Sequence, residues 1–518
     1  MRELQGIRLR YAGFVAFFAQ MLTLVTGTLF TIMVTRRLGE TEFGSWLLIS
    51  NYALYFVFPS AVVGYWVTRY EARGTAAART GLIMNGVLSL AVVLPYLLFS
   101  GLLSSSAAIR YQYFLGMGFF VVLYYVLAAL ESVAAATQPE SQYLSSIVFE
   151  VAKVVSGFLL LLVWRLQLAG AITGLVVAYA LRLVALGALV RRRLGGGFDS
   201  ALGRRIIRQS WIPLYVGLAS FVGMLDYVAV TFLASMGTTT VNQEAAIEFS
   251  KRVLGNYGAA FSVGVIVTYS SSLAVAVYPK LLGGGGSKDV EESLRMVSTF
   301  AVPICIGAII LARPILNLIN PIYAPSYPVV LALAVAGLLS AISTPYDSVI
   351  VGTEKVELRQ EATFRDFLKS RLFLSPTIVC IGGAVRLLML FVGFLGLRGI
   401  LQGDVLVAAV FWSLSYLVSW IPIAVGRWRL AREALPTVFP RRSLLNILVA
   451  CAAMSAVALL FSGMPLAVQS SAALAALLPV ILASAGTYFV VLYVLDGWFR
   501  SVVARASSLL ASLSDRVL

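Results

Sequence analysis

The chain has 518 residues, of which 60% are hydrophobic and only 12% charged, and its mean hydropathy is +0.91. This composition leaves no room for a separate soluble domain. The absence of histidine excludes His-based catalysis, His metal ligation and a histidine proton relay. A net charge of +16 would favour nucleic acid in a soluble protein, but in a membrane protein it follows from basic residues collecting in cytoplasmic loops, so no nucleic-acid partner is expected.

Fourteen apolar stretches run along the chain, each of roughly 20 residues, the length that an α-helix needs to cross the hydrocarbon of a bilayer. We therefore predict an all-α polytopic membrane protein with about 14 transmembrane helices. In chain order the expected spans are 11–35, 43–66, 79–101, 112–135, 143–164, 168–190, 209–234, 255–278, 296–313, 327–350, 375–397, 404–425, 443–463 and 473–495.

The loops between these spans differ in their basic residues. The side that holds the N-terminus and every second loop carries 28 of the 39 lysines and arginines, the opposite side carries 8, and three lie inside spans. The positive-inside rule then places both termini in the cytoplasm of a multi-pass protein of the cell (cytoplasmic) membrane.

A basic loop after the sixth span divides the chain. We predict an N-lobe of six spans over 1–190, a basic cytoplasmic linker over 191–208 and a C-lobe of six spans over 209–425. Both lobes would begin in the cytoplasm, as in a parallel repeat. Spans 13 and 14 follow over 426–495, and the residues 496–518 read as a cytoplasmic interfacial amphipathic tail.

Several short motifs occur in an order and spacing typical of one transporter group. They are Thr35–Gly39, Glu42–Gly44, Tyr278–Leu282, Ala301–Ile304, Arg313–Leu318, Tyr323 and Val351–Lys355. Together with the pattern of spans they resemble polysaccharide-type flippases of the multidrug/oligosaccharidyl-lipid/polysaccharide (MOP) exporter superfamily.

The resemblance implies a MATE-like fold in which two pseudo-symmetric six-helix lobes surround a cavity that opens alternately to either side, with two additional C-terminal helices. It also implies a transporter rather than an enzyme, which flips a polyprenyl- or dolichyl-phosphate-linked oligosaccharide across the membrane. An ion-coupled exporter of small molecules is the alternative, and a membrane glycosyltransferase is a third. The implied partners are the lipid-linked glycan, the bilayer and glycan assembly proteins, and a functional monomer is expected.

The resemblance also bears on individual residues. Arginines line the cavity of related lipid II flippases in helices one, two and eight, and Arg252 occupies the position of helix eight here. Spans one and two contain no such arginine, which argues against lipid II as the cargo. Span one has no acidic residue, whereas small-molecule exporters of the superfamily often carry one there.

Charged residues inside spans are costly in hydrocarbon and should face protein or a water-filled cavity. Glu150 and Arg182 lie at matching depths in neighbouring spans, so we expect a structural ion pair between them. Lys153, one turn from Glu150, and Arg386 are candidates, with Arg252 and Arg182, for binding the substrate phosphate. No cofactor or metal is expected.

Asp226 has no basic neighbour at its own depth in the sequence pattern. A lone buried carboxylate either holds a proton or binds a cation. Asp226 is therefore the candidate for ion coupling, with Na⁺ and H⁺ both open.

Overall fold

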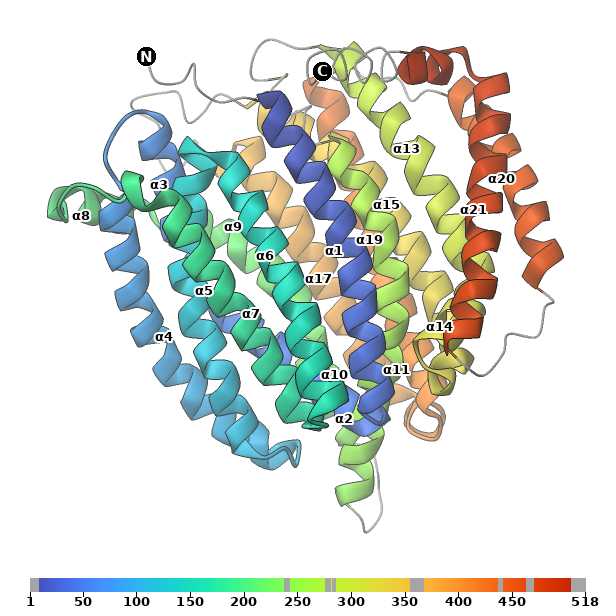
Figure 1. The fold of residues 1–518 in the computed structure, drawn as a ribbon, viewed down its shortest axis with the longest axis horizontal. Coiled ribbons are helices and arrows are strands. Elements are labelled where there is room, and N and C mark those ends of the chain that lie inside the picture. Colours follow the sequence, from blue (N-terminus) through green and yellow to red (C-terminus); the bar gives the residue numbers. More distant parts are fainter. Residues whose placement is uncertain are drawn as a thin grey trace. The chain divides into compact units, whose positions relative to one another are not determined.

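A computed structural model of the chain describes residues 9–236, 243–274, 281, 286–354, 368–436, 441–462 and 470–504, and within these ranges every regular element is a helix (Figure 1). The elements, in chain order, are α1 (Leu9–Arg37), α2 (Glu40–Val57), α3 (Ser60–Ala72), α4 (Ala78–Ser106), α5 (Tyr111–Thr137), α6 (Pro139–Gly157), η2 (Phe158–Val163), α7 (Gln167–Val190), η3 (Arg191–Arg193), α8 (Ser200–Gln209), α9 (Trp211–Met224), α10 (Asp226–Ser235), α11 (Gln243–Gly264), η4 (Val265–Ala274), α13 (Ser287–Ile310), α14 (Ala312–Ile319), η5 (Pro321–Ser326), α15 (Tyr327–Gly352), α17 (Arg371–Gly396), α18 (Arg398–Leu401), α19 (Val405–Ala434), α20 (Arg441–Ser462) and α21 (Ser470–Leu495).

Twelve stretches of the described residues are long and apolar enough to cross a membrane, or up to 13 if the bent pair α2 and α3 is one span. The all-α polytopic fold is therefore confirmed, and the expected number of 14 spans is approximate. The predicted tail lies mostly outside the described residues, which end at Ala504.

The second span is broken where the sequence pattern suggested one continuous helix. α2 and α3 meet at 48° around Pro59, which has no N–H to donate and disfavours helix for the residue before it. The carbonyls that the break frees find other donors. The Tyr125 hydroxyl donates to the Phe56 carbonyl at 2.8 Å, and the Ser60 hydroxyl donates to the Val57 carbonyl at 2.7 Å. Such compensation is required because hydrocarbon offers no water to these groups.

The eighth span begins earlier than the pattern of apolar residues indicated. The expected range was 255–278, but the structure extends a candidate span over Gln243–Ala274. The first turns of α11 carry Glu248, Lys251 and Arg252, which lowered the local hydropathy below that of a membrane helix. The structure therefore places Arg252 within a helix long enough to span, rather than in a loop.

The chain forms two compact units, one over 1–258 with 383–411 and the other over 259–382 with 412–518. In the first unit α6 packs against α1 and α7, and α7 packs against α5 (Figure 1). In the second unit α13 packs against α15 and α20, and α20 packs against α21. The lobe boundaries read from the sequence stay a prediction.

Candidate functional site

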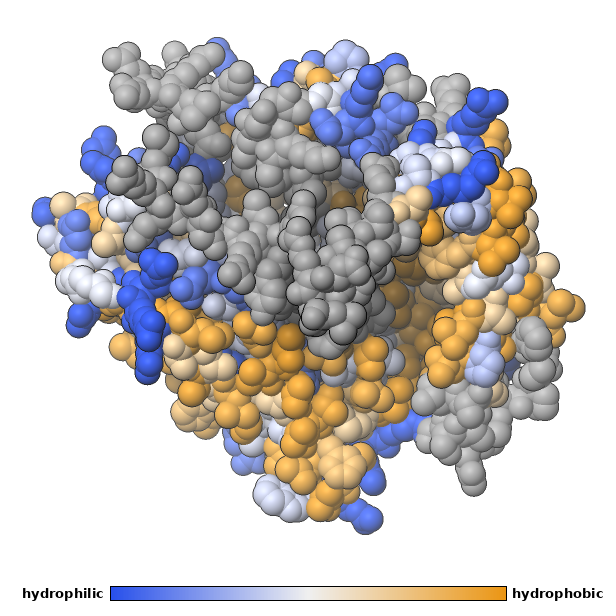
Figure 2. Space-filling model, turned by 45° about the horizontal axis from the view of Figure 1, so that its top comes forward, coloured by the Kyte–Doolittle hydropathy of each residue, from blue (hydrophilic) through white to orange (hydrophobic). Residues whose placement is uncertain are grey.

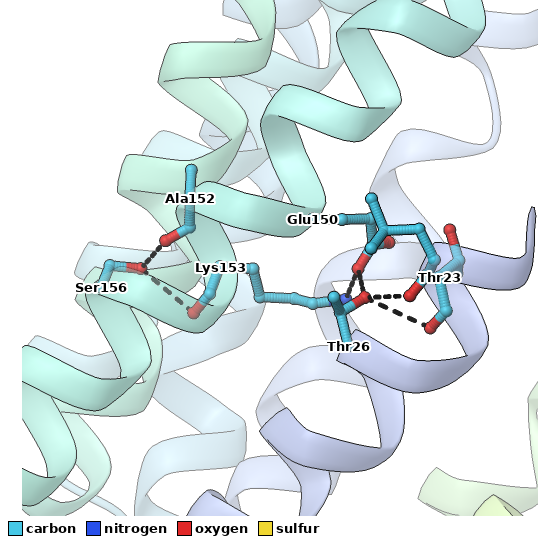
Figure 3. Close-up of polar contacts among 7 residues, drawn as sticks. Thr23, Thr26, Glu150, Ala152, Lys153 and Ser156 are labelled. Atoms are coloured by element: carbon cyan, nitrogen blue, oxygen red, sulfur yellow. Dashed lines mark hydrogen bonds and ion pairs between the residues drawn. The ribbon is translucent and has the colours of Figure 1, made fainter. Parts of the chain in front are cut away.

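The charged side chains that lie deep in the spans form ion pairs, and the first of these ties α6 to α1. Lys153 and Glu150 lie one turn apart on α6, and the Lys153 Nζ is 2.6 Å from the Glu150 Oε2. The Thr26 hydroxyl of α1 donates to the same carboxylate (Figure 3). All three side chains are buried. The pair is thus held between two helices that are distant in sequence.

Aromatic rings cover the ammonium of this pair. The Lys153 Nζ lies 5.1 Å from the centre of the Phe149 ring and 6.0 Å from that of Phe30. A cation over a ring face gains electrostatic energy that partly offsets its desolvation. Lys153 is therefore a neutralised, enclosed cation in this structure.

The second pair joins α7 to α5 and corrects one prediction. Arg182 Nη2 lies 2.5 Å from Glu131 Oε1, and it also donates to the Ser146 hydroxyl of α6 at 2.9 Å. The expected pair of Glu150 with Arg182 is wrong. The reason is helix rotation: Glu150 faces α1, where Lys153 and Thr26 satisfy it, whereas Arg182 reaches across to α5.

The third pair changes the interpretation of Asp226. This residue begins α10, directly after the break that separates α10 from α9, and its Oδ2 lies 3.2 Å from the Arg386 Nη1 of α17. The two side chains are only 2% and 7% exposed. α17 comes close to α9 because Gly383 has no side chain: a Cβ there would lie 3.0 Å from Val222 Cγ1. Asp226 is therefore not the lone carboxylate that the sequence indicated.

A fourth pair was missed by the sequence analysis and lies in the second unit. Arg427 Nε of α19 is 3.3 Å from Asp347 Oδ1 of α15. The Ser375 hydroxyl of α17 donates to the same oxygen at 2.5 Å, and Arg427 donates to the Ser343 hydroxyl at 3.3 Å. The expected end of span 12 at residue 425 left Arg427 in a loop, but α19 continues to Ala434.

Arg252 contacts two acidic side chains, Glu248 one turn earlier on α11 and Glu40 at the start of α2. Its guanidinium is 2.8 Å from Glu248 and 4.0 Å from Glu40, and Asn256 donates to Glu40 at 2.9 Å. The Arg252 side chain is 48% exposed. The neighbouring Lys251, which the sequence analysis did not select, is buried and donates to the Ala108 carbonyl at 3.2 Å.

Glycines let α2 and α11 approach each other at this point. A Cβ on Gly44 would lie 1.9 Å from the Lys251 carbonyl oxygen, and one on Gly255 would lie 2.8 Å from the Glu40 carbonyl oxygen. Small residues at such contacts are how membrane helices pack without a hydrophobic driving force between them.

All four predicted phosphate ligands are paired with acidic side chains of the protein. Lys153, Arg182, Arg386 and Arg252 each lie within 4.0 Å of a carboxylate. They belong to separate pairs rather than to one cluster. Among the described residues no group of three or more Cys, Asp or Glu side chains is arranged to hold a metal ion.

Comparison with solved structures identifies the fold. The lipid II flippase MurJ, in an inward closed conformation, superposes with a TM-score of 0.62 and 13% identity over 95% of this chain and 99% of its own. A multidrug resistance MATE family transporter of the MOP superfamily, inward-facing, gives a TM-score of 0.52 and 12% identity over 79% of this chain and 94% of its own. The MATE transporter VcmN of Vibrio cholerae, a mutant form, gives 0.50 and 14% over 82% and 96%.

No family profile matches the sequence, and no curated protein matches it. The fold is nevertheless that of polytopic membrane transporters. The chain has the arrangement of helices found in MurJ and in MATE transporters, as its resemblance to the MOP superfamily implied.

Proposed function

We propose that the chain is a flippase that moves a polyprenyl- or dolichyl-phosphate-linked oligosaccharide across the cytoplasmic membrane by alternating access, with both termini in the cytoplasm. The observation that carries this proposal is the extent of the likeness to MurJ. That flippase aligns over 95% of this chain, whereas the MATE transporters named above align over 79% and 82%.

Lys153 is the strongest candidate to hold the substrate phosphate. Its ammonium is buried and already bound to an anion, Glu150. A phosphate oxygen can make the same charge-assisted hydrogen bond as a carboxylate oxygen, so the substrate can replace Glu150 on the Lys153 ammonium, while the displaced carboxylate keeps the Thr26 hydroxyl as a donor. A replacement anion matters because a buried ion pair that loses one partner destabilises the protein by about 3–5 kcal/mol. Arg182, whose partners are Glu131 and Ser146, is a second ligand of the same kind.

Three variants separate a phosphate ligand from a merely structural pair. In proteoliposomes loaded with a lipid-linked oligosaccharide, we expect Lys153→Gln to lose translocation and Glu150→Gln to keep it, because Lys153 is then free for phosphate. The double variant removes the charge imbalance and should be stably folded but inactive. Translocation by the double variant at the wild-type rate would overturn the role of Lys153.

A MATE-like exporter of small molecules remains the second candidate, favoured by the superposition with two MATE structures at TM-scores of 0.52 and 0.50. The two functions predict different losses in cells that lack the protein. Loss of a flippase leaves lipid-linked glycan on the inner leaflet, whereas loss of an exporter leaves cells sensitive to amphiphilic drugs.

A further inference from the structure

The short helix α8, in the connection between the sixth and seventh spans, is fixed to the first unit by specific contacts. Its apolar face, Leu202 and Ile206, is buried against Ala77. At its end, the Tyr70 hydroxyl lies 3.2 Å from the Gln209 Oε1. The predicted basic linker over 191–208 therefore contains most of a helix that is held in place by these contacts.

The residues that lead into α8 are held in place as well. Arg79 of α4 donates to the Gly196 carbonyl at 2.9 Å, and the backbone N–H of Asp199 donates to the Thr80 hydroxyl at 3.0 Å. The Asp199 carboxylate caps α8 by accepting from the N–H groups of Ala201 and Leu202. The one carboxylate between residues 191 and 208 is thereby occupied by backbone groups.

The outer face of α8 combines positive charge with apolar side chains. Arg204, Arg205 and Arg208 are exposed, and within the described ranges none of them lies in an ion pair. Ile207 is 66% exposed and Phe198, just before the helix, is 52% exposed. We call this set the α8 surface. Such a mixture of basic and apolar side chains is typical of a helix that lies in the headgroup region of a membrane.

The position of α8 along the chain agrees with that location. It follows directly on a candidate span that ends at Arg193 and precedes one that begins at Pro213. The helix therefore lies at the level where spans leave the membrane. In Figure 2, hydrophilic residues adjoin hydrophobic ones on the side where α8 lies in Figure 1.

We infer that the α8 surface binds the headgroups of anionic phospholipids in the adjoining leaflet, with Phe198 and Ile207 in contact with the upper acyl chains. The positive-inside rule alone accounts for arginines in this loop. It does not account for a helix fixed by a buried face and a cap, which presents three arginines and two apolar side chains together. A phosphodiester in front of three guanidinium groups satisfies charges for which the described part of the chain supplies no carboxylate.

Native mass spectrometry of the purified full-length protein tests this site, with phosphatidylglycerol and phosphatidylcholine as probes. We expect phosphatidylglycerol to be retained more strongly than phosphatidylcholine. The variant Arg204→Gln/Arg205→Gln/Arg208→Gln should retain phosphatidylglycerol about ten-fold more weakly, since each basic residue near an anionic surface contributes to binding. Ile207→Ser should weaken retention by a smaller factor.

A charge-matched control distinguishes a specific surface from net charge. The variant Arg429→Gln/Arg432→Gln/Arg442→Gln removes three exposed arginines elsewhere on the chain and should retain phosphatidylglycerol like the wild type. Thermal unfolding in detergent should be unchanged in both triple variants, because all six side chains are exposed. Equal retention by the two triple variants, or displacement of the lipid by millimolar inorganic phosphate, would overturn the inference.

Discussion

Glu131 on α5 and Arg182 on α7 form an ion pair of 2.5 Å, and Arg182 also donates to the Ser146 hydroxyl of α6. Asp347 on α15 and Arg427 on α19 form a similar ion pair at 3.3 Å, in which the Ser375 hydroxyl of α17 donates to the carboxylate. Counted along the predicted spans, the first pair joins spans 4 and 6 and contacts a hydroxyl of span 5. The second pair joins span 10 to the helix of span 12 and contacts a hydroxyl of span 11.

A second relationship recurs between the first and fifth spans of each half. In the first half Thr26 of α1 contacts the Glu150–Lys153 pair of α6, and in the second half Asp226 of α10 pairs with Arg386 of α17. The residue types differ while the helices that they join correspond. If the two halves are the repeat that the sequence predicts, polar contacts at the same positions in the order of spans are expected in each half.

The Asp226–Arg386 pair predicts a strong imbalance between single and double variants. Arg386→Met leaves a buried carboxylate without its cation and should destabilise the protein by about 3–5 kcal/mol. Asp226→Leu/Arg386→Met should recover most of this loss, because no buried charge is left. Thermal unfolding in detergent measures both, and a double variant as unstable as the single one would contradict the assignment.

The same pair bears on ion coupling. Because the Arg386 guanidinium already neutralises Asp226, we expect Asp226→Asn to leave the dependence of transport on Na⁺ and H⁺ gradients unchanged, even where the rate falls. Proteoliposomes with imposed gradients provide the measurement. Loss of gradient dependence in this variant would restore Asp226 as the coupling residue.

Lys251 should behave in the opposite way to Lys153. Its buried ammonium donates to a neutral carbonyl, whereas Lys153 is bound to a carboxylate. Lys251→Met therefore removes a desolvated charge and should leave the stability unchanged or raise it, while Lys153→Met leaves Glu150 unpaired and should lower it by about 3–5 kcal/mol. Parallel melting curves of the two variants decide the matter, and equal losses would refute the distinction.

The contact between α2 and α11 predicts intolerance of any side chain at Gly44. Gly44→Ala places a Cβ against the Lys251 backbone, which cannot move like a flexible side chain, and should cost about 1–3 kcal/mol. Gly86→Ala, on α4, is the matched control, because no atom lies within 4 Å of the added Cβ. We expect the control to keep or slightly raise the unfolding temperature. A Gly44→Ala variant as stable as this control would show that the helices can separate there at no cost.

The sequence alone determined that this chain is an all-α membrane protein, close to how many times its helices span, and many of the residues that place charge within those spans. Hydropathy is a local property, so about 20 consecutive residues suffice to reveal a span. The ends of α11 and α19 were misplaced because charged residues continue into both helices and lower the hydropathy there.

Only the tertiary structure decided which charges meet. Asp226 and Arg386 lie on helices far apart in the chain, and Glu150 turns to α1 instead of α7 because of the rotation of α6 about its own axis. Depth in the membrane can be estimated by counting residues, but the facing of a side chain depends on how neighbouring helices pack. Four cations that the sequence offered as ligands for a phosphate were thereby found beside carboxylates, since a buried charge without its opposite is costly.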